Sequence, residues 1–165
     1  MKQQDFKFFK ELVEAPSPSG FEQPAQRVIR KALADVADDI RTDVMGNVVA
    51  HIQGPKGAPR LMLAGHCDEI GFMIKYIDDQ GYLFFAPIGG VDAHLVPGQR
   101  VTVHTSSGPV PGVVGKRPIH QIEPQEREKV IPFKTQFIDI GCSNKKAAVK
   151  LVSIGDPVTF SVGVE

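Results

Sequence analysis

Nonpolar residues in the first 36 positions recur at the three- and four-residue spacing of amphipathic helices. The first stripe predicts a helix capped by Asp5 that must end before Pro16, since proline cannot continue a helix. The second stripe predicts another helix, and Ser19 and Glu22 stand ahead of it at capping-box spacing. The stripes consist of Phe6, Phe9, Leu12 and Val13, then Ala25, Val28, Ile29, Ala32, Leu33 and Val36. Both indicate packing faces rather than chemistry.

The pattern changes to that of strands after residue 39. Residues 40–44 and 48–52 predict a hairpin, because Gly46 and Asn47 between them suit a tight turn. Residues 61–64 are continuously nonpolar, which is typical of a strand covered on both faces. This run is the most core-like strand of the first half, and it leads directly into polar residues.

From Ile70 onward, short nonpolar runs alternate with turns rich in glycine and proline. The predicted strands cover residues 71–77, 82–86, 101–104, 110–114, 137–140 and 158–162. Strands at this spacing favour a small barrel or a sandwich. A polar stretch at 116–133, which includes Glu126 and Arg127, predicts a long loop or a short helix.

Composition narrows the class of protein. The 165 residues contain 19 Lys plus Arg and 19 Asp plus Glu, so the formal net charge is zero. That balance gives no support to a nucleic-acid interface or an anionic-membrane patch, which both need a basic excess. No nonpolar run approaches the roughly 18 residues of a membrane span. Two cysteines do not make a disulfide framework, so we expect free thiols and a cytoplasmic location.

The candidate chemistry lies at His66-Cys67-Asp68-Glu69, directly after the nonpolar run. In an extended backbone His66 and Asp68 point to the same side, and a histidine that binds a metal usually donates its other ring nitrogen to a carboxylate. This favours His66 as a metal ligand and Asp68 as the residue that orients it. Two alternatives stay open. One is an ordinary strand-to-loop turn, and the other is a carboxylate-pair hydrolase using Asp68 and Glu69, which adjacent positions on opposite faces arrange poorly.

The wider string Leu61 to Met73 closely resembles the first metal-ligand motif of the glutamyl and deblocking aminopeptidases. These are dinuclear metallopeptidases that include the tetrahedral aminopeptidases. Five further segments resemble family landmarks in the same order: Ser17–Glu22, Asp43–Val48, Pro87–Gly90, Val96–Val101 and Ile154–Val158. The resemblance therefore covers nearly the whole chain.

The resemblance implies an α/β fold. Residues 1–69 would be the N-terminal portion of a metallopeptidase αβα sheet domain, and 70–160 an inserted, PDZ-like β-barrel for dimerisation. Residues 161–165 would return towards the catalytic domain. It also implies removal of N-terminal residues from peptides by water activated between two divalent metal ions, zinc or cobalt, in a homo-oligomer. In that scheme His66 binds one metal ion, and Asp68 orients His66.

The sequence departs from the family pattern in one respect. In the family the remaining metal ligands and the general base follow the inserted domain, and none of the other acidic residues or histidines here stands in a comparable setting. We therefore expect an N-terminal half that is inactive alone. The alternative is a non-catalytic oligomerisation module of the same family.

Overall fold

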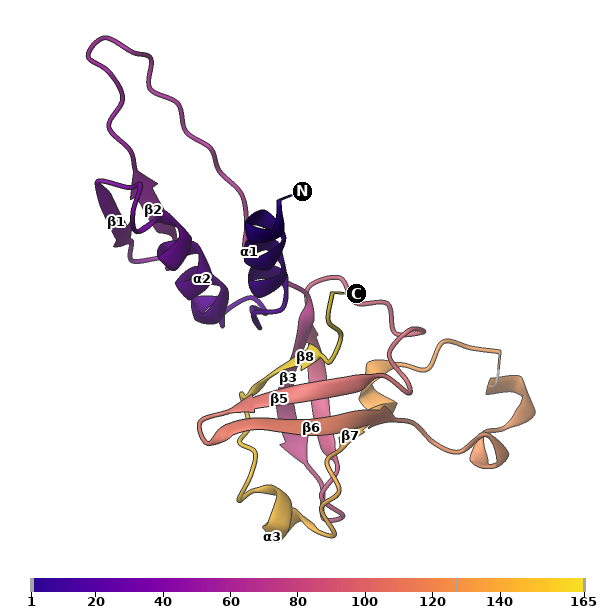
Figure 1. Cartoon of the computed structure of the whole chain (residues 1–165). Coiled ribbons are helices and arrows are strands. Elements are labelled where there is room, and N and C mark those ends of the chain that lie inside the picture. Colours follow the sequence, from indigo (N-terminus) through magenta and orange to yellow (C-terminus); the bar gives the residue numbers. More distant parts are fainter. Residues whose placement is uncertain (1, 127, 165) are drawn as a thin grey trace. The chain divides into compact units, whose positions relative to one another are not determined.

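The chain divides into two units, each defined by residues that contact one another. The computed structural model describes residues 2–126 and 128–164 (Figure 1). Unit 1 holds the described residues up to Ser17, residues 21–68 and Val164, and unit 2 holds residues 18–20 and 69–163. Arg127 of the predicted polar stretch and the end residues Met1 and Glu165 lie outside the described residues.

Unit 1 contains two helices and one hairpin. Helix α1 spans Gln3–Val13 and α2 spans Gln23–Leu33, so both predicted helices are confirmed. Strands β1 (Asp39–Thr42) and β2 (Val48–His51) pair antiparallel, which confirms the predicted hairpin. None of the described helices is long and nonpolar enough to cross a membrane.

The predicted helix caps are wrong. Lys2 rather than Asp5 is the N-cap of α1, and Asp5 lies within the first turn. Helix α2 begins directly after Glu22, so Glu22 rather than Ser19 is its N-cap, and the Glu22 side chain makes no cap bond. A proline in the first turn of α2 explains the start, because proline has no N–H for a cap to satisfy there.

The β1–β2 turn is held by Asp43. Its carboxylate accepts the backbone N–H groups of Met45 and Asn47 at 2.9 Å, and the side-chain amide of Asn47 at 2.9 Å. The hydrogen bond from the Asn47 side chain is the main reason that the pKa of Asp43 is lowered. Gly46 adopts φ +90°, the conformation that the sequence pattern required of this turn.

The predicted strand at residues 61–64 is wrong. The segment carries no strand pairing, and the exposed fractions of Leu61, Met62 and Leu63 are 84%, 85% and 88%. A strand exists only where a neighbour pairs with its backbone. Within the described residues of unit 1, β1 and β2 pair only with each other.

Unit 2 is a closed barrel, which decides between the two predicted β architectures. Its antiparallel strands follow the order β3-β4-β7-β6-β5-β8 (Figure 1). They span Gly71–Ile77 (β3), Leu83–Ile88 (β4), Arg100–Thr105 (β5), Gly108–Gly115 (β6), Phe137–Asp139 (β7) and Pro157–Phe160 (β8). Strand β8 closes the barrel, since Val158 pairs with Phe72 of β3 and with Val103 of β5. Each described strand of this barrel therefore has a paired neighbour on both sides.

The longer connections of unit 2 contain short helical turns. The polar stretch predicted as a loop or short helix contains the 3₁₀ turns η1 (Ile119–Gln121) and η2 (Pro124–Glu126), and η3 (Phe133–Thr135) begins at its last residue. Helix α3 spans only Lys145–Ala148, and the side chain of Asn144 caps it by accepting the Ala147 N–H at 3.0 Å.

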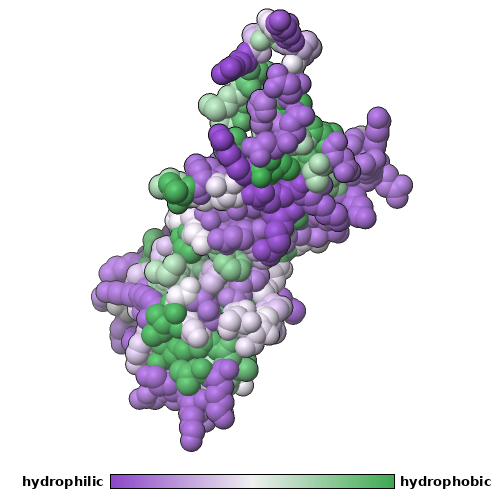
Figure 2. Space-filling model, turned by 90° about the vertical axis from the view of Figure 1, so that its left-hand side faces the viewer, coloured by the Kyte–Doolittle hydropathy of each residue, from purple (hydrophilic) through white to green (hydrophobic). Residues whose placement is uncertain are grey.

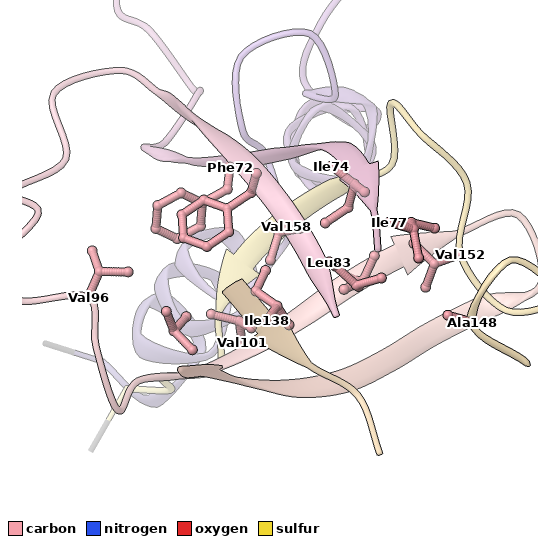
Figure 3. Close-up of a cluster of buried hydrophobic side chains, with 13 residues drawn as sticks. Phe72, Ile74, Ile77, Leu83, Val96, Val101, Ile138, Ala148, Val152 and Val158 are labelled. Atoms are coloured by element: carbon pink, nitrogen blue, oxygen red, sulfur yellow. The ribbon is translucent and has the colours of Figure 1, made fainter. Parts of the chain in front are cut away.

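The hydrophobic core lies inside the barrel. Figure 3 shows its side chains converging between the strands. The cluster consists of Phe72, Ile74, Ile77, Leu83, Phe85, Val96, Val101, Val103, Val114, Ile138, Ala148, Val152 and Val158. Phe72 stands edge-on to Phe85 and to Phe160, with ring centroids 4.6 and 5.2 Å apart. All of these residues belong to unit 2, whereas Ala25 is the single buried hydrophobic residue in the described part of unit 1.

Strands β5 and β8 also share a polar contact. The Nε2 atom of His104 lies 2.8 Å from Oγ1 of the buried Thr159. Burial lowers the pKa of His104, because the positive imidazolium is desolvated inside the structure. The unfolded chain, where this pKa is ordinary, therefore binds a proton more readily than the barrel does.

We expect the barrel to lose stability as the pH falls through 6.5, the ordinary pKa of histidine, towards the lower pKa of folded His104. The contribution of His104 to the free energy of unfolding is fully present above pH 6.5. The chain has no Trp and two Tyr, both in unit 2, so urea unfolding followed by tyrosine fluorescence at pH 8 and pH 5 reports this unit alone. The variant His104→Gln should reduce the pH difference. His94→Gln, at an exposed position, should leave it unchanged, and an equal effect of both variants would contradict the assignment.

Candidate metal-binding site

The two residues predicted to act at a metal site lie together in unit 1. The Nδ1 atom of His66 is 2.8 Å from Oδ1 of Asp68 and 3.2 Å from the backbone oxygen of Asp68. A carboxylate only accepts, so Nδ1 carries the proton and donates it to Asp68. This fixes the tautomer in which Nε2, the opposite ring nitrogen, carries the lone pair that can bind a metal ion.

The pair stands at the surface. The His66 side chain is 86% exposed and the Asp68 side chain 34%. The contact joins residues two positions apart in a segment that has no strand pairing, so local chain geometry produces it without a surrounding sheet. The contact between the predicted ligand and the residue predicted to orient it therefore lies within one short segment.

The adjacent residues Cys67 and Glu69 do not extend the His66–Asp68 pair into a larger site. Cys67 is half-buried, and burial, followed by the charges of Glu22 and Asp68, raises the pKa of its thiol. A raised pKa disfavours the thiolate, which is the form that binds metals or attacks substrates. Glu69 belongs to unit 2, where it forms an isolated β-bridge with Pro18.

The donor set does not fit a complete metal centre. Across residues 2–126 and 128–164, no group of three His, Cys, Asp or Glu side chains is arranged to hold a metal ion. A catalytic zinc takes about three protein ligands and a water molecule. His66 supplies one donor, so no catalytic step follows from these residues alone.

A second feature, which the sequence pattern did not indicate, is a hollow of about 280 Å³ beside α2. Its lining includes Arg27, Arg30 and Thr42. The Arg30 guanidinium donates to the backbone oxygen of Ile40 at 3.4 Å and to the Thr42 hydroxyl, so it ties α2 to β1. Arg30 acts here as a structural tether, and only the arrangement of α2 against the hairpin reveals it.

Comparison with known proteins identifies the family. The sequence pattern that defines the M42 glutamyl aminopeptidases matches residues 46–165. The chain belongs to the M42 glutamyl aminopeptidase family. Among curated M42 relatives, the lysyl aminopeptidase of Pyrococcus furiosus is 36% identical over 149 residues, covering 89% of this chain and 42% of that protein.

Comparison with solved structures identifies the same family. A TET aminopeptidase from the marine sediment archaeon Thaumarchaeota archaeon SCGC AB-539-E09 is 35% identical, with a TM-score of 0.90 over 96% of this chain and 45% of that one. The TET1 peptidase of Pyrococcus horikoshii, which can assemble into a tetrahedron or a large octahedral shell, is 33% identical with a TM-score of 0.82 over 94% of this chain and 46% of that one. This M42 chain therefore spans less than half the length of the relatives it matches.

Proposed function

We propose that this chain is the N-terminal part of a metal-dependent aminopeptidase, which removes N-terminal residues from peptides. The observation that carries the proposal is the 2.8 Å contact between His66 Nδ1 and Asp68 Oδ1 in a chain of the M42 family. His66 is the ligand to one of two divalent metal ions, zinc or cobalt. Asp68 orients its imidazole.

The metal ions, when bound, supply water activated for attack on the peptide carbonyl. Asp68 holds the proton on Nδ1 and thereby keeps the lone pair on Nε2. The other donors of the centre come from polypeptide beyond the described residues. The carboxylate-pair alternative is less well supported, because Asp68 is already bonded to His66 and Glu69 lies in a β-bridge.

We further propose that unit 1 is part of an αβα catalytic domain and unit 2 a PDZ-like inserted domain. Unit 2 interrupts unit 1 in sequence, and Val164 belongs to unit 1 again. There the Val164 N–H donates to Glu14 Oε1 at 2.9 Å, and Lys10 Nζ donates to the Val164 oxygen at 3.3 Å. The assembly of the TET1 peptidase into a tetrahedron or an octahedral shell supports a homo-oligomer, for which we propose the barrel as the interface. Two free cysteines suit a cytoplasmic protein.

The second candidate function is a non-catalytic assembly module. The observation that favours it is that the barrel of unit 2 has a complete core, whereas the donors in the described residues do not form a metal centre. The two functions differ in whether His66 and the other metal ligands come together in one site.

We expect the 165-residue polypeptide alone to hydrolyse no chromogenic amino-acid amide, lysyl and glutamyl amides included, with Zn²⁺ or Co²⁺ added. The physical reason is that one histidine cannot hold a catalytic metal ion. Turnover by this polypeptide would contradict the proposed donor set.

The complementary experiment joins residues 1–165 to the portion of the Pyrococcus furiosus lysyl aminopeptidase that follows its matched region. We expect this chimera to hydrolyse such amides and to lose that activity when the metal is removed with a chelator. A folded, metal-loaded chimera without turnover would favour the assembly module instead.

A further inference from the structure

One side of α2 is polar and basic. Four of its side chains stand at the helical spacing i, i+3, i+4 and i+7, which places them on the same side: Gln23, Gln26, Arg27 and Arg30. The nonpolar stripe that contains the buried Ala25 lies on the opposite side of the helix. Figure 2 shows mostly purple, hydrophilic residues on the face of unit 1 that it presents, with green nonpolar residues between them. The polar side of α2 therefore takes no part in hydrophobic packing.

These four side chains line the hollow of about 280 Å³ beside α2, within unit 1. Thr42 and Gly46 line it on the hairpin side. The side-chain amide of Gln26 donates to the backbone oxygen of Gly46 at 2.8 Å. The Arg30 guanidinium donates to the backbone of β1 and to the Thr42 hydroxyl. Two tethers between α2 and the hairpin therefore hold the walls of the hollow in place.

The two arginines of the hollow carry positive charge that no carboxylate balances. The ion pairs among the described residues involve neither Arg27 nor Arg30. The lining contains one carboxylate, that of Glu22, and after burial its charge is a cause of the raised pKa of the Cys67 thiol. Residues three positions apart on a helix are neighbours, so the two guanidinium groups repel each other. An anion held between them removes this repulsion.

The hydrogen-bond donors left in the hollow indicate the kind of anion. A guanidinium has five N–H donors, of which Arg30 uses two for its tethers, and Arg27 forms no side-chain hydrogen bond with a described residue. A phosphate group carries a charge of about −1.5 to −2 at pH 7 and three strong acceptor oxygens. A carboxylate has a single charge and two oxygens. Two unbalanced positive charges with several free donors therefore match a phosphate group better than a carboxylate.

We propose that the hollow between α2 and the β1–β2 hairpin binds a phosphate group, which accepts hydrogen bonds from Arg27 and Arg30. The volume is just below the roughly 300–1,000 Å³ of pockets for drug-sized ligands, so the ligand is inorganic phosphate or a small phosphate ester. The site shares no residue with the His66–Asp68 pair. The inference therefore does not depend on the proposed catalytic activity.

Isothermal titration of inorganic phosphate into the 165-residue chain tests the proposal, at constant ionic strength because salt screens the attraction. We expect saturable binding with a Kd on the order of 1 mM. Arg27→Gln should weaken it by about tenfold, since a charge-assisted hydrogen bond is lost and glutamine keeps the helix. Arg41→Gln is the matched control, because it removes the same charge from the neighbour of Thr42 on β1, which points to the other face. Glu22→Gln should strengthen binding, because it removes a negative charge from the lining.

NMR of the isotope-labelled chain locates the bound phosphate without any substitution. The backbone amide signals of Thr42 and Gly46, which line the hollow, should shift as phosphate is added and should saturate with the same Kd. Shifts that leave both signals unchanged would overturn the proposed position.

The remaining outcomes are equally distinct. Weakened binding in Arg27→Gln with normal binding in Arg41→Gln supports the site. Absence of saturable binding at about tenfold the expected Kd, or equal weakening in both variants, overturns it in favour of general charge attraction. Acetate or succinate binding as tightly as phosphate overturns the choice of anion. Glycerol phosphate distinguishes the two sources: tighter binding than inorganic phosphate supports a phosphate ester, and weaker binding supports the free ion.

Discussion

Replacing Phe72 with alanine should unfold the barrel of unit 2 under mild conditions. Phe72 is fully buried, and its ring packs edge-on against Phe85 and Phe160. It also lies on β3, which pairs with both β4 and the closing strand β8. Removal of a buried phenylalanine side chain costs about 3–5 kcal/mol, against a total stability of about 5–15 kcal/mol for a typical domain.

Tyrosine fluorescence during urea unfolding measures this loss, because both tyrosines belong to unit 2. The matched control is Met73→Ala, one position along the same strand, where the side chain is 43% exposed and points away from the core. We expect the control to cost less than about 1 kcal/mol. Equal shifts for Phe72→Ala and Met73→Ala would show that Phe72 is not a core residue.

The barrel could be predicted from sequence because it contains every partner that its strands need. The nonpolar run at residues 71–77, which is followed by turn residues, predicts β3, and β4 and β8 pair with it within the same unit. The spacing of the strands favours a barrel or a sandwich without choosing between them, because it defines the strands and does not define their neighbours. The resemblance to the family implies the barrel. Closure through Val158, which pairs on both sides, is a property of the whole unit.

The segment at 61–64 shows where such reasoning fails. A continuous nonpolar run indicates that a segment requires cover on both faces, and it does not show that the cover exists. In the structure Leu61 and Leu63 are more than four-fifths exposed. The same nonlocal dependence explains why Arg30 was missed, since its bonds to β1 exist only once α2 lies against the hairpin.

The candidate site likewise has one part that depends on local sequence and another that depends on the rest of the fold. The contact between His66 and Asp68 is local, joining residues two positions apart, and the spacing anticipates it. Their roles towards a metal ion stay a prediction, because the other donors of a centre must come from elsewhere in the fold. No local pattern around residue 66 can state which side chains those are.

Replacing His66 with alanine should therefore have a larger effect on activity than any substitution of a neighbouring residue. In the chimera with the lysyl aminopeptidase, His66→Ala removes the proposed metal ligand, and we expect kcat/KM to fall by about 100-fold or more. Asp68→Asn keeps an acceptor for the Nδ1 proton but removes the charge, so metal affinity should fall by about 10–100-fold. Because only affinity is lost, excess Zn²⁺ or Co²⁺ should restore most activity to Asp68→Asn and little to His66→Ala.

Isothermal titration of metal into the metal-free chimera, together with kcat/KM at several metal concentrations, separates these two effects. The control is His51→Ala, which removes an exposed histidine on β2 of the same unit and should leave both metal affinity and kcat/KM unchanged. Full activity in His66→Ala would exclude His66 as a ligand. Unchanged metal affinity in Asp68→Asn would mean that the 2.8 Å contact positions the loop without tuning the imidazole for a metal ion.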